Sequence, residues 1–209
     1  MQSATMLDVM DRVTTGAGLR ERGKAKRRAA ITHAAFELFA GQGYDATTIA
    51  EIATAAEVSP RTVTLYFRSK QDIAFATFDA SVLNLTEILR GRAPGESVVQ
   101  ALEGWLREEM ACHDETDHLE LRMFEVNPEL RAVRTARMAA AIEEGAHIIA
   151  EDTGQPPDGI GPRLAAAAAA AVVTEIFEHP KEADRDQAIS AAMTFLTGGI
   201  KAMAASAGH

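Results

Sequence analysis

The 209-residue sequence lacks several features that define large classes of protein. Its single cysteine, Cys112, excludes an internal disulfide framework and a four-cysteine zinc site, and is consistent with a reducing cytoplasm. No apolar run approaches the ~20 residues of a membrane-spanning helix, and the longest such run, Leu164–Val173, is mostly alanine. The beginning of the sequence lacks the succession of charged region, apolar region and cleavage site that predicts secretion. We therefore expect a cytoplasmic protein that does not enter the membrane.

Charge is distributed unevenly along the chain. The net charge is −9 over all 209 residues, which by itself argues against a nucleic-acid partner. Residues 1–70, however, contain ten Lys and Arg against seven Asp and Glu, a net charge of +3, whereas residues 71–209 contain eleven against twenty-three, a net charge of −12. A basic first part and an acidic second part indicate that only the first part contacts a polyanion.

The first part begins with a polar stretch and a basic run. We interpret residues 1–19 as a polar stretch without regular apolar spacing and therefore expect a flexible arm. Six of the nine residues of Arg20–Arg28 are basic, which suits phosphate contacts because each neutralised phosphate releases counterions. A solvated start to a helix is the alternative for this run. Apolar residues at helical spacing then predict a helix over about 24–41 that ends at Gly41 and Gly43.

Residues 45–70 have the pattern of a helix-turn-helix. Thr48 and Glu51 match a capping box at the start of a first helix. Ser59 followed by Pro60 predicts the start of a second helix after a tight joint. In such a unit the second helix enters the major groove of DNA.

The second helix of this unit presents an outward face that suits DNA. Apolar residues occupy the inner positions of this helix. Its four polar side chains are therefore directed largely outward, and they are Arg61, Thr62, Thr64 and Tyr66. An ordinary surface helix would carry more Glu and Lys, whereas Arg, Thr and Tyr suit base edges, thymine methyl groups and phosphates. The predicted DNA-binding set also includes Ser59 and the last two residues of the basic run, Arg27 and Arg28.

The second part is predicted to be helical. Apolar spacing predicts helices over about 70–90, 96–113, 117–126, 128–152, 161–178 and 184–205. We place the domain boundary in the first of these, with a DNA-binding domain over 20–70 and a larger domain over 71–209. Seven consecutive alanines, Ala165–Ala171, and the pair Gly198-Gly199 give the last two helices small faces that permit close packing. We expect a homodimer built through these two helices; high helix propensity is the other explanation of the alanines.

The segment ITHAAFELFAGQGYDATTIAEIATAAEVSPRTVTLYFRSKQDI resembles the N-terminal domain of the tetracycline-repressor (TetR) family of bacterial regulators. The matching features are Ala35 with Phe39, Gly43-Tyr44, Thr47-Thr48, Ile52-Ala53, Val58-Ser59, Thr62, Tyr66-Phe67 and Ser69-Lys70. The run from Leu119 through Asn127-Pro128 to Arg137 is similar to one branch of the family.

The resemblance implies an all-α protein with a three-helix helix-turn-helix head and a larger helical body that binds a ligand and forms a dimer. It implies phosphate contacts by Thr48 and Lys70, and a recognition face that consists of Thr62, Thr64 and Tyr66. Many family members carry glycine at position 61, an aromatic residue at 64 and histidine at 66, where this chain has Arg, Thr and Tyr. The mode of DNA binding is therefore implied, whereas the operator sequence is not.

The resemblance also implies a ligand pocket between the helices of the body. The side chains proposed for its apolar walls are Trp105, Met110, Phe124, Met138 and Phe177. Those proposed as polar anchors are His113, Arg122 and His147. Taken singly, each is more typical of an ordinary core or surface position.

Two features invite interpretation as an enzyme, and we favour neither. Cys112-His113 has the composition of a thiol nucleophile beside a base, but a helix-end cysteine next to a charged loop explains it. Possible metal ligands crowd into one run without the spacing of a tetrahedral site, so a solvated acidic loop is preferred; they are His113, Asp114, Glu115, Asp117, His118 and Glu120. No Gly-rich phosphate loop is present. We expect no cofactor, no metal and no catalytic residues.

The most concrete hypothesis is a dimeric one-component transcriptional regulator, a repressor that a small-molecule effector releases from a palindromic operator in double-stranded DNA. The alternative is an effector-independent DNA-binding or architectural protein that a protein partner controls. The two share the head, so only the body distinguishes them. An enclosed cavity favours the first, and a tightly packed body favours the second.

Overall fold

The computed structural model describes residues 4–112, 114–178 and 185–206, with side chains from residue 20 onward except at positions 204 and 206. All regular secondary structure within these ranges is α-helical, as the sequence predicts. The chain divides into two compact units. The first, which we call the head, contains the residues up to Ala76 together with Arg122–Asn127. The second, the body, contains Thr77–Leu121 and the chain from Pro128 onward.

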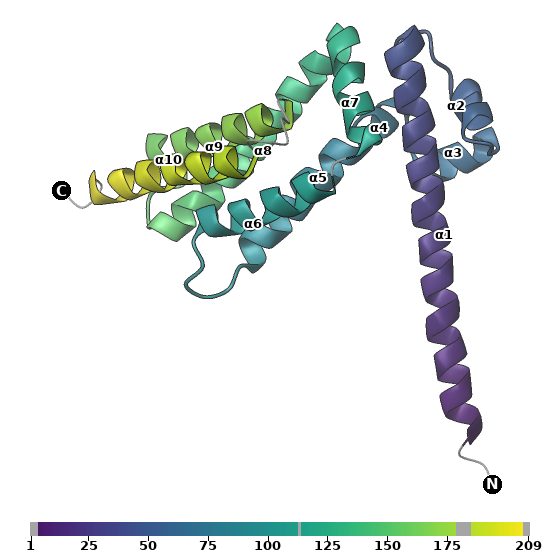
Figure 1. Ribbon diagram of the computed structural model, residues 1–209, viewed down its shortest axis with the longest axis horizontal. Coiled ribbons are helices and arrows are strands. Elements are labelled where there is room, and N and C mark those ends of the chain that lie inside the picture. The colour runs from purple at the N-terminus through teal and green to yellow at the C-terminus, as the bar shows by residue number, and fades with distance from the viewer. Residues whose placement is uncertain (1–3, 113, 179–184, 207–209) are drawn as a thin grey trace. The chain divides into compact units, whose positions relative to one another are not determined.

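The head is built on four helices, which are α1 (Ala4–Gln42), α2 (Ile49–Ala55), α3 (Pro60–Tyr66) and α4 (Lys70–Ala74). Figure 1 shows α2 and α3 beside the C-terminal half of α1. Helices as short as the last three do not persist alone in water, so their geometry depends on a shared core. That core contains side chains with at most 4% of their surface exposed: Ile31, Phe36, Phe39, Ile52, Val63, Phe67, Ile73 and Phe75.

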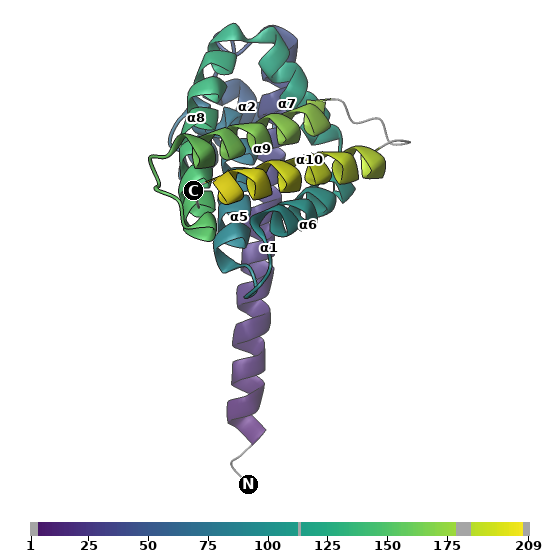
Figure 2. The ribbon, with the colours of Figure 1, turned by 90° about the vertical axis from the view of Figure 1, so that its left-hand side faces the viewer.

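Helix α1 begins earlier than the sequence predicts. The predicted helix starts near residue 24, whereas the helical backbone starts at Ala4, and Figure 2 shows this first half extending past the other head helices. The segment contains no proline, so nothing in it interrupts helical hydrogen bonding. The predicted arm over residues 1–19 did not include this helix, although Met6, Val9, Met10 and Val13 are apolar residues at helical spacing. The expected flexibility of residues 1–19 stays a prediction.

The helix predicted over 70–90 is two helices, α4 and α5 (Ala76–Gly91), which are separated at Phe75. Phe75 has φ −109° and ψ 12°, and its buried ring lies 5.4 Å from the ring of Phe124 between centroids. In the first turn of α5, where backbone amides lack helical partners, the amide of Phe78 donates to the carboxyl group of Glu120. A side chain that bonds to the backbone at such a point is a recognised cause of helix kinks.

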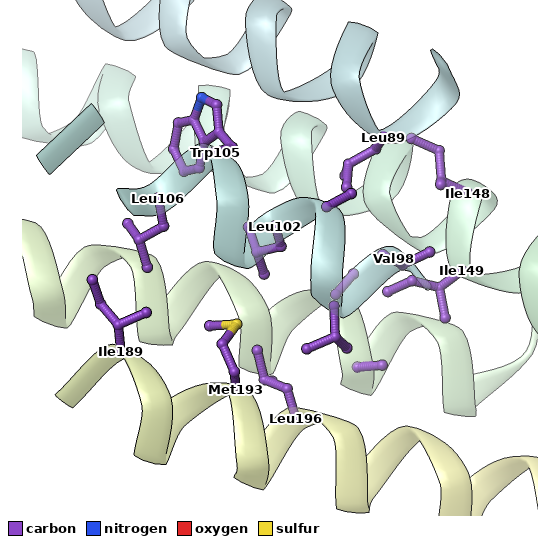
Figure 3. Close-up of a cluster of buried hydrophobic side chains, with 14 of the residues drawn as sticks. Leu89, Val98, Leu102, Trp105, Leu106, Ile148, Ile149, Ile189, Met193 and Leu196 are labelled. Atoms are coloured by element: carbon purple, nitrogen blue, oxygen red, sulfur yellow. The ribbon is translucent and has the colours of Figure 1, made fainter. Parts of the chain in front are cut away.

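The body surrounds one apolar cluster with α5, α6 (Val98–Ala111), α8 (Pro128–Thr153), α9 (Ile160–Glu178) and α10 (Arg185–Ser206). In Figures 1 and 2, α8, α9 and α10 lie side by side. Figure 3 shows the side chains that converge on the cluster, among them Leu89, Val98, Leu102, Leu106, Ile148, Ile149, Ile189, Met193 and Leu196. The body therefore has its own core, and the connections to the head need not supply its stability.

Helix α7 (Glu115–Val126) contributes residues to both units. Its residues up to Leu121 belong to the body, and those from Arg122 belong to the head. Asn127, directly after it, is 3% exposed. Its Nδ2 donates to the carbonyl oxygens of Phe39 (3.0 Å) and Met123 (2.8 Å), and its Oδ1 accepts from the amide of Tyr44 at 2.7 Å. The division at residue 70 that the sequence suggests differs from this one because a distant segment completes the head.

Helix α9 qualifies the expectation about membrane spans. Among the described residues it is the one helix long and apolar enough to cross a membrane, with a mean hydropathy of 1.4 over an 18-residue window that is 22% buried. Length and composition are weak evidence for a span, because core helices of other proteins also meet them. Alanine supplies most of the apolar character here, and α9 packs against α8 and α10 in the body.

Candidate nucleic-acid interface

A capping box fixes the start of α2, as the sequence predicts. Thr48 Oγ1 accepts from the Glu51 amide at 3.2 Å, and Glu51 Oε2 accepts from the Thr48 amide at 2.8 Å. Thr48 Oγ1 also donates to Glu51 Oε2 at 2.8 Å, and this bond, followed by the one from the Thr48 amide, lowers the pKa of Glu51. The Thr48 hydroxyl is exposed but already occupied by the cap, so its contact with a phosphate stays a prediction.

The turn between α2 and α3 contains a residue in the left-handed region. Glu57 has φ 54°, a conformation that reverses the chain within a few residues. Ser59 then caps α3: its Oγ accepts from the Thr62 amide at 3.0 Å and lies 2.8 Å from the Thr62 hydroxyl. Pro60 occupies the first position of the helix. The predicted helix-turn-helix layout is therefore present in the head.

The exposed face of α3 differs in two respects from the predicted one. Arg61 and Thr64 are exposed, as expected, whereas Thr62 and Tyr66 are half-buried. Leu65 is 81% exposed, and the sequence analysis did not include it. It follows Arg61 by four residues and so shares its face, and the inner positions of the helix were already filled. An exposed leucine on such a helix suits contact with a thymine methyl group.

The basic run lies on α1 and reaches the end of α3. Its first cations are exposed, and they are Arg20, Arg22, Lys24 and Lys26. Arg27 Nη1 donates to the hydroxyl oxygen of Tyr66 at 3.4 Å, and Arg28 Nη1 donates to the carbonyl oxygen of Tyr66 at 3.4 Å. The Arg28 guanidinium also lies 4.4 Å from the ring centroid of Phe67. The structure thus brings the predicted residues of α1 and α3 together on the head.

The ammonium group of Lys70 is bound to backbone carbonyl groups of the head, whereas a phosphate contact requires one of its donors to be available. Its Nζ donates to the backbone carbonyl oxygens of Tyr44 (2.5 Å), Thr47 (2.9 Å) and Asp45 (3.4 Å). The ammonium group also lies 4.2 Å from the ring centroid of Tyr44. An ammonium group has three donors, and all three are used within the head. In this state Lys70 holds the loop before α2, and its contact with DNA stays a prediction.

The described residues of the predicted ligand set are divided between the two units. Trp105 and Met110 are buried in the body, and the ring of Phe177 lies 6.1 Å from that of Trp105 between centroids. Phe124 and Arg122 belong to the head, where Phe124 is buried and Arg122 is exposed. Periodicity along α7 could not show that its two ends belong to different units.

Two further residues of that set lie on α8. On α8, Met138 is half-buried and His147 is exposed, whereas His113 lies outside the described residues. A surface cavity of about 510 Å³ opens elsewhere in the body, at the connection of α5 and α6, and its lining contains none of the predicted residues. It is lined by Arg90, Arg92, Ala93, Pro94, Gly95, Glu96, Ser97 and Asp152.

The acidic run after Cys112 is mostly helical, which corrects its interpretation as a solvated loop. Helix α7 starts at Glu115, and helical spacing directs Glu120 inward, where its Oε1 is buried. Within the described ranges, no group of three or more His, Cys, Asp or Glu side chains is arranged to hold a metal ion. Cys112 is exposed at the end of α6.

Two capped helices joined by a tight turn, with an exposed α3 and an adjoining basic run, define a helix-turn-helix DNA-binding protein. Comparison with known families gives the particular group. The profile described as "Bacterial regulatory proteins, tetR family" matches residues 31–77, and the profile described as "MftR C-terminal domain" matches residues 93–201, more than half of the chain. The protein belongs to the TetR family of bacterial transcriptional regulators, and the family indicates a regulator, not an enzyme.

Curated relatives match less than half of the chain. The HTH-type transcriptional regulator TcmR of Streptomyces glaucescens is 39% identical over 92 residues, which cover 44% of this chain and 41% of that protein. The HTH-type transcriptional repressor Rv3405c of Mycobacterium tuberculosis is 35% identical over 81 residues, or 39% of this chain and 43% of that protein. The chain spans only about two fifths of the length of these relatives.

Solved structures match over most of the chain and confirm the fold. NalD of Pseudomonas aeruginosa, described as the secondary repressor of the MexAB-OprM multidrug efflux pump, superposes with a TM-score of 0.59 at 23% identity, over 84% of this chain and 97% of that chain. SmeT in complex with triclosan has a TM-score of 0.58 at 18% identity, over 83% and 90% of the two chains. At these identities the likeness concerns the fold alone.

Proposed function

We propose that this protein is a dimeric, cytoplasmic transcriptional repressor that binds a palindromic operator in double-stranded DNA and is released from it by a small molecule. The observation that carries the proposal is the exposed face of α3 beside the basic run of α1 in one compact head. TcmR and Rv3405c, a regulator and a repressor by name, are similar to part of this chain, which supports the direction of the proposed regulation.

The head would bind DNA with α3 in the major groove. Its exposed side chains there are Arg61, Thr64 and Leu65. Arg61 suits hydrogen bonding to a guanine edge, Thr64 suits a hydrogen bond through its hydroxyl group, and Leu65 suits contact with a thymine methyl group. The cations of Arg20–Arg28 would contact phosphates and supply affinity without sequence preference. Two heads of a dimer would then read half-sites with centres about 34–36 Å apart.

Exposed apolar faces on the last two helices of the body support dimerisation. Leu164 on α9 is 57% exposed and Phe195 on α10 is 66% exposed. Further exposed small residues lie on the same two faces at helical spacing, namely Ala167, Ala171, Ala191 and Gly199. Apolar surface of this kind is ordinarily covered by a partner, and small residues allow the helices of a second copy to pack closely. A four-helix interface between two copies would cover both faces.

Release by a ligand would depend on the body. NalD is named a repressor of a drug efflux pump and SmeT was solved with triclosan, and we extend ligand control to this chain. The aromatic pair Trp105 and Phe177 is the part of the predicted pocket that the body brings together. Because α7 has residues in both units, a ligand that shifts its first turns would also act on the head. Couplings of this kind are typically about 1–3 kcal/mol.

Selection of bound fragments from a random DNA pool by the purified protein tests the proposal. We expect enrichment of a palindrome, with Arg61→Ala and Thr64→Ala changing the preferred bases, and with Glu129→Ala in the body as an unaffected control. Absence of any enriched sequence would contradict a sequence-specific regulator, and a motif without two-fold symmetry would contradict the dimer. Operator binding that no small-molecule extract of the host reverses would favour the effector-independent alternative.

A further inference from the structure

Two neighbouring arginines of α1 contact the end of α3 in different ways. Arg27 Nη1 donates to the hydroxyl oxygen of the Tyr66 side chain at 3.4 Å. Arg28 Nη1 donates to the backbone carbonyl oxygen of Tyr66, also at 3.4 Å, and its guanidinium lies 4.4 Å from the ring centroid of Phe67. Phe67 is a core residue with 4% of its surface exposed. Arg27 therefore reaches the tip of a side chain, whereas Arg28 holds the backbone end of the helix and a core ring.

The C-terminal end of α3 has little support of its own. The last carbonyl groups of a helix lack partners within it, and α3 has no basic residue in its last turn. The backbone leaves the helical conformation at Phe67, which has φ −138° and ψ 131°. Arg28 supplies a donor for the last carbonyl group and a positive charge at the negative end of the helix dipole. Part of the C-terminal cap of α3 thus comes from α1.

The N-terminal end of α3 is fixed independently of α1. Ser59 caps it by accepting from the Thr62 amide at 3.0 Å, and in the turn before it the Val58 amide donates to the carbonyl oxygen of Ala53 on α2 at 2.9 Å. A helix of seven residues does not persist alone in water, so its direction depends on what holds its two ends. The cap and the turn hold the first end, and the contacts of Arg28 hold the second.

We infer that Arg28 is a positioning residue for DNA recognition, which fixes the direction of α3 against α1 and thereby decides which bases are read. Its two contacts need arginine, because a planar guanidinium can lie over a ring and donate to an acceptor in a fixed geometry, whereas an ammonium group is a compact point charge. The inference rests on the proposed function and assigns to Arg28 a role other than the phosphate contacts that suit the basic run as a whole.

The direction of α3 determines where its exposed side chains lie in the major groove. The helix is about 10 Å long, so a tilt of about 10° about its capped end would move its other end by roughly 2 Å. A hydrogen bond or methyl contact does not survive such a displacement. Thr64 and Leu65 lie toward the moving end, and Arg61 lies beside the cap. Loss of Arg28 is therefore expected to relax the preference for the bases opposite Thr64 and Leu65 and to spare the base opposite Arg61.

The variant Arg28→Lys separates positioning from a phosphate contact, because lysine keeps the positive charge. The full-length protein is titrated with the DNA motif that the wild type selects and with a duplex of scrambled sequence. We expect at least about tenfold weaker binding of the motif, with unchanged binding of the scrambled duplex. Arg131→Lys, an exposed change on α8, is the matched control. Wild-type affinity of Arg28→Lys for the motif would overturn the inference, because charge alone would then suffice.

The variant Arg28→Ala adds the salt dependence as a second readout. A phosphate contact would lower the slope of log affinity against log salt by about one and weaken both duplexes alike, as is expected of Arg22→Ala. A positioning residue instead predicts a loss confined to the motif, with an unchanged slope on the scrambled duplex. Equal weakening of both duplexes by Arg28→Ala would therefore overturn the inference in favour of a phosphate contact.

Hydrogen exchange in the absence of DNA keeps the test independent of the proposed function. The Phe67 amide donates to the Val63 carbonyl oxygen at 2.9 Å, so its exchange reports opening at the end of α3. In Arg28→Lys we expect this amide to exchange at least about threefold faster, while the Ile52 amide of α2 keeps its rate. An unchanged Phe67 amide, or equal acceleration at both amides, would overturn the inference. Faster exchange at Phe67 in a protein that binds no specific DNA would contradict the proposed function.

Discussion

At the scale of single residues, surroundings change what a glutamate can do. Glu51 is exposed, and hydrogen bonds from Thr48 lower its pKa. Oε1 of Glu120 is buried, and burial followed by the charge of Asp117 raises the pKa of this carboxyl group to about 8. A capping pattern in the sequence reveals the first environment, because both partners lie three residues apart. Nothing local reveals the second, because the groups around Glu120 come from several helices.

The raised pKa of Glu120 predicts a specific pH dependence of stability. The unfolded side chain ionises near pH 4.5 and the folded one near 8, so the stabilising contribution is complete below pH 4.5 and is lost as the pH rises through 8. Relative to Glu120→Gln, the wild-type free energy of unfolding is expected to fall by about 3–5 kcal/mol between pH 5 and 9. Urea unfolding followed by Trp105 fluorescence measures it, and a difference independent of pH would refute the prediction.

Lys70 and Arg22 are expected to differ in what they contribute, although both are cations of the head. Lys70→Met leaves three backbone carbonyl groups without their donor, so it is expected to destabilise the head by about 1–3 kcal/mol. Arg22→Ala removes an exposed charge of α1, so it is expected to lower the slope of log affinity against log salt by about one without a stability change. Thermal unfolding and DNA titrations at several salt concentrations separate the two effects.

If Lys70→Met instead lowers the salt slope at a temperature where the head is fully folded, Lys70 contacts a phosphate when DNA is bound. That outcome would restore the role that the family resemblance implies. It would also require the ammonium group to leave at least one of its carbonyl partners on the loop before α2.

At the scale of elements, the sequence predicts helices well where the signals are local. The starts of α2, α3 and α6 each have a capping side chain, at Thr48, Ser59 and Ser97, and the first two were predicted. The break between α4 and α5 was not, because it depends on the buried contact of Phe75 with Phe124 and on Glu120, which are distant in sequence. Propensity over residues 70–90 indicates one continuous helix, and tertiary contacts override it.

Asn127 is expected to be a main support of the head. Its replacement by alanine leaves the amide of Tyr44 and the carbonyl of Phe39 unpaired in a buried place, so Asn127→Ala should cost about 2–4 kcal/mol. Asn84→Ala, an exposed change on α5, serves as the control. The two tyrosines of the chain, Tyr44 and Tyr66, lie in the head and Trp105 in the body. In the Asn127→Ala variant, tyrosine absorbance is therefore expected to report unfolding of the head earlier than Trp105 fluorescence reports unfolding of the body. Two transitions that coincide with each other and are not shifted from those of the wild type would contradict this role of Asn127.

At the scale of the whole molecule, the sequence predicts the DNA-binding part better than the ligand-binding part. The head residues are close together in the chain, so spacing and charge locate Arg61, Thr64 and the basic run, though not Leu65. The predicted ligand pocket depends on which helices meet, and among the described residues of the predicted set Trp105, Met110 and Phe177 belong to the packed body interior or its margin. The sequence indicated aromatic and polar side chains as candidates for the pocket, but it could not show that Oε1 of Glu120 is buried.

The proposed dimer predicts that one substitution changes both assembly and DNA binding. Phe195→Glu places a charge on the exposed apolar face of α10, which a close interface would have to desolvate. We expect a monomer by analytical ultracentrifugation and a large loss of operator affinity, because the two heads are no longer linked. Lys201→Glu changes charge on another side of α10 and is the matched control. A dimeric Phe195→Glu protein would rule out this interface.

The division of the head between two segments also constrains how new regulators of this kind arise. Recombination between two genes at residue 76 would transfer most of a head but would take residues 122–127 from the other parent. The Tyr44 amide and the Phe39 carbonyl would then depend on whatever residue the other parent supplies at position 127. A hybrid gene that combines an intact head with the body of the other parent needs three crossovers, after residues 76, 121 and 127. Point changes on the exposed face of α3 are therefore the simpler route to a new operator preference.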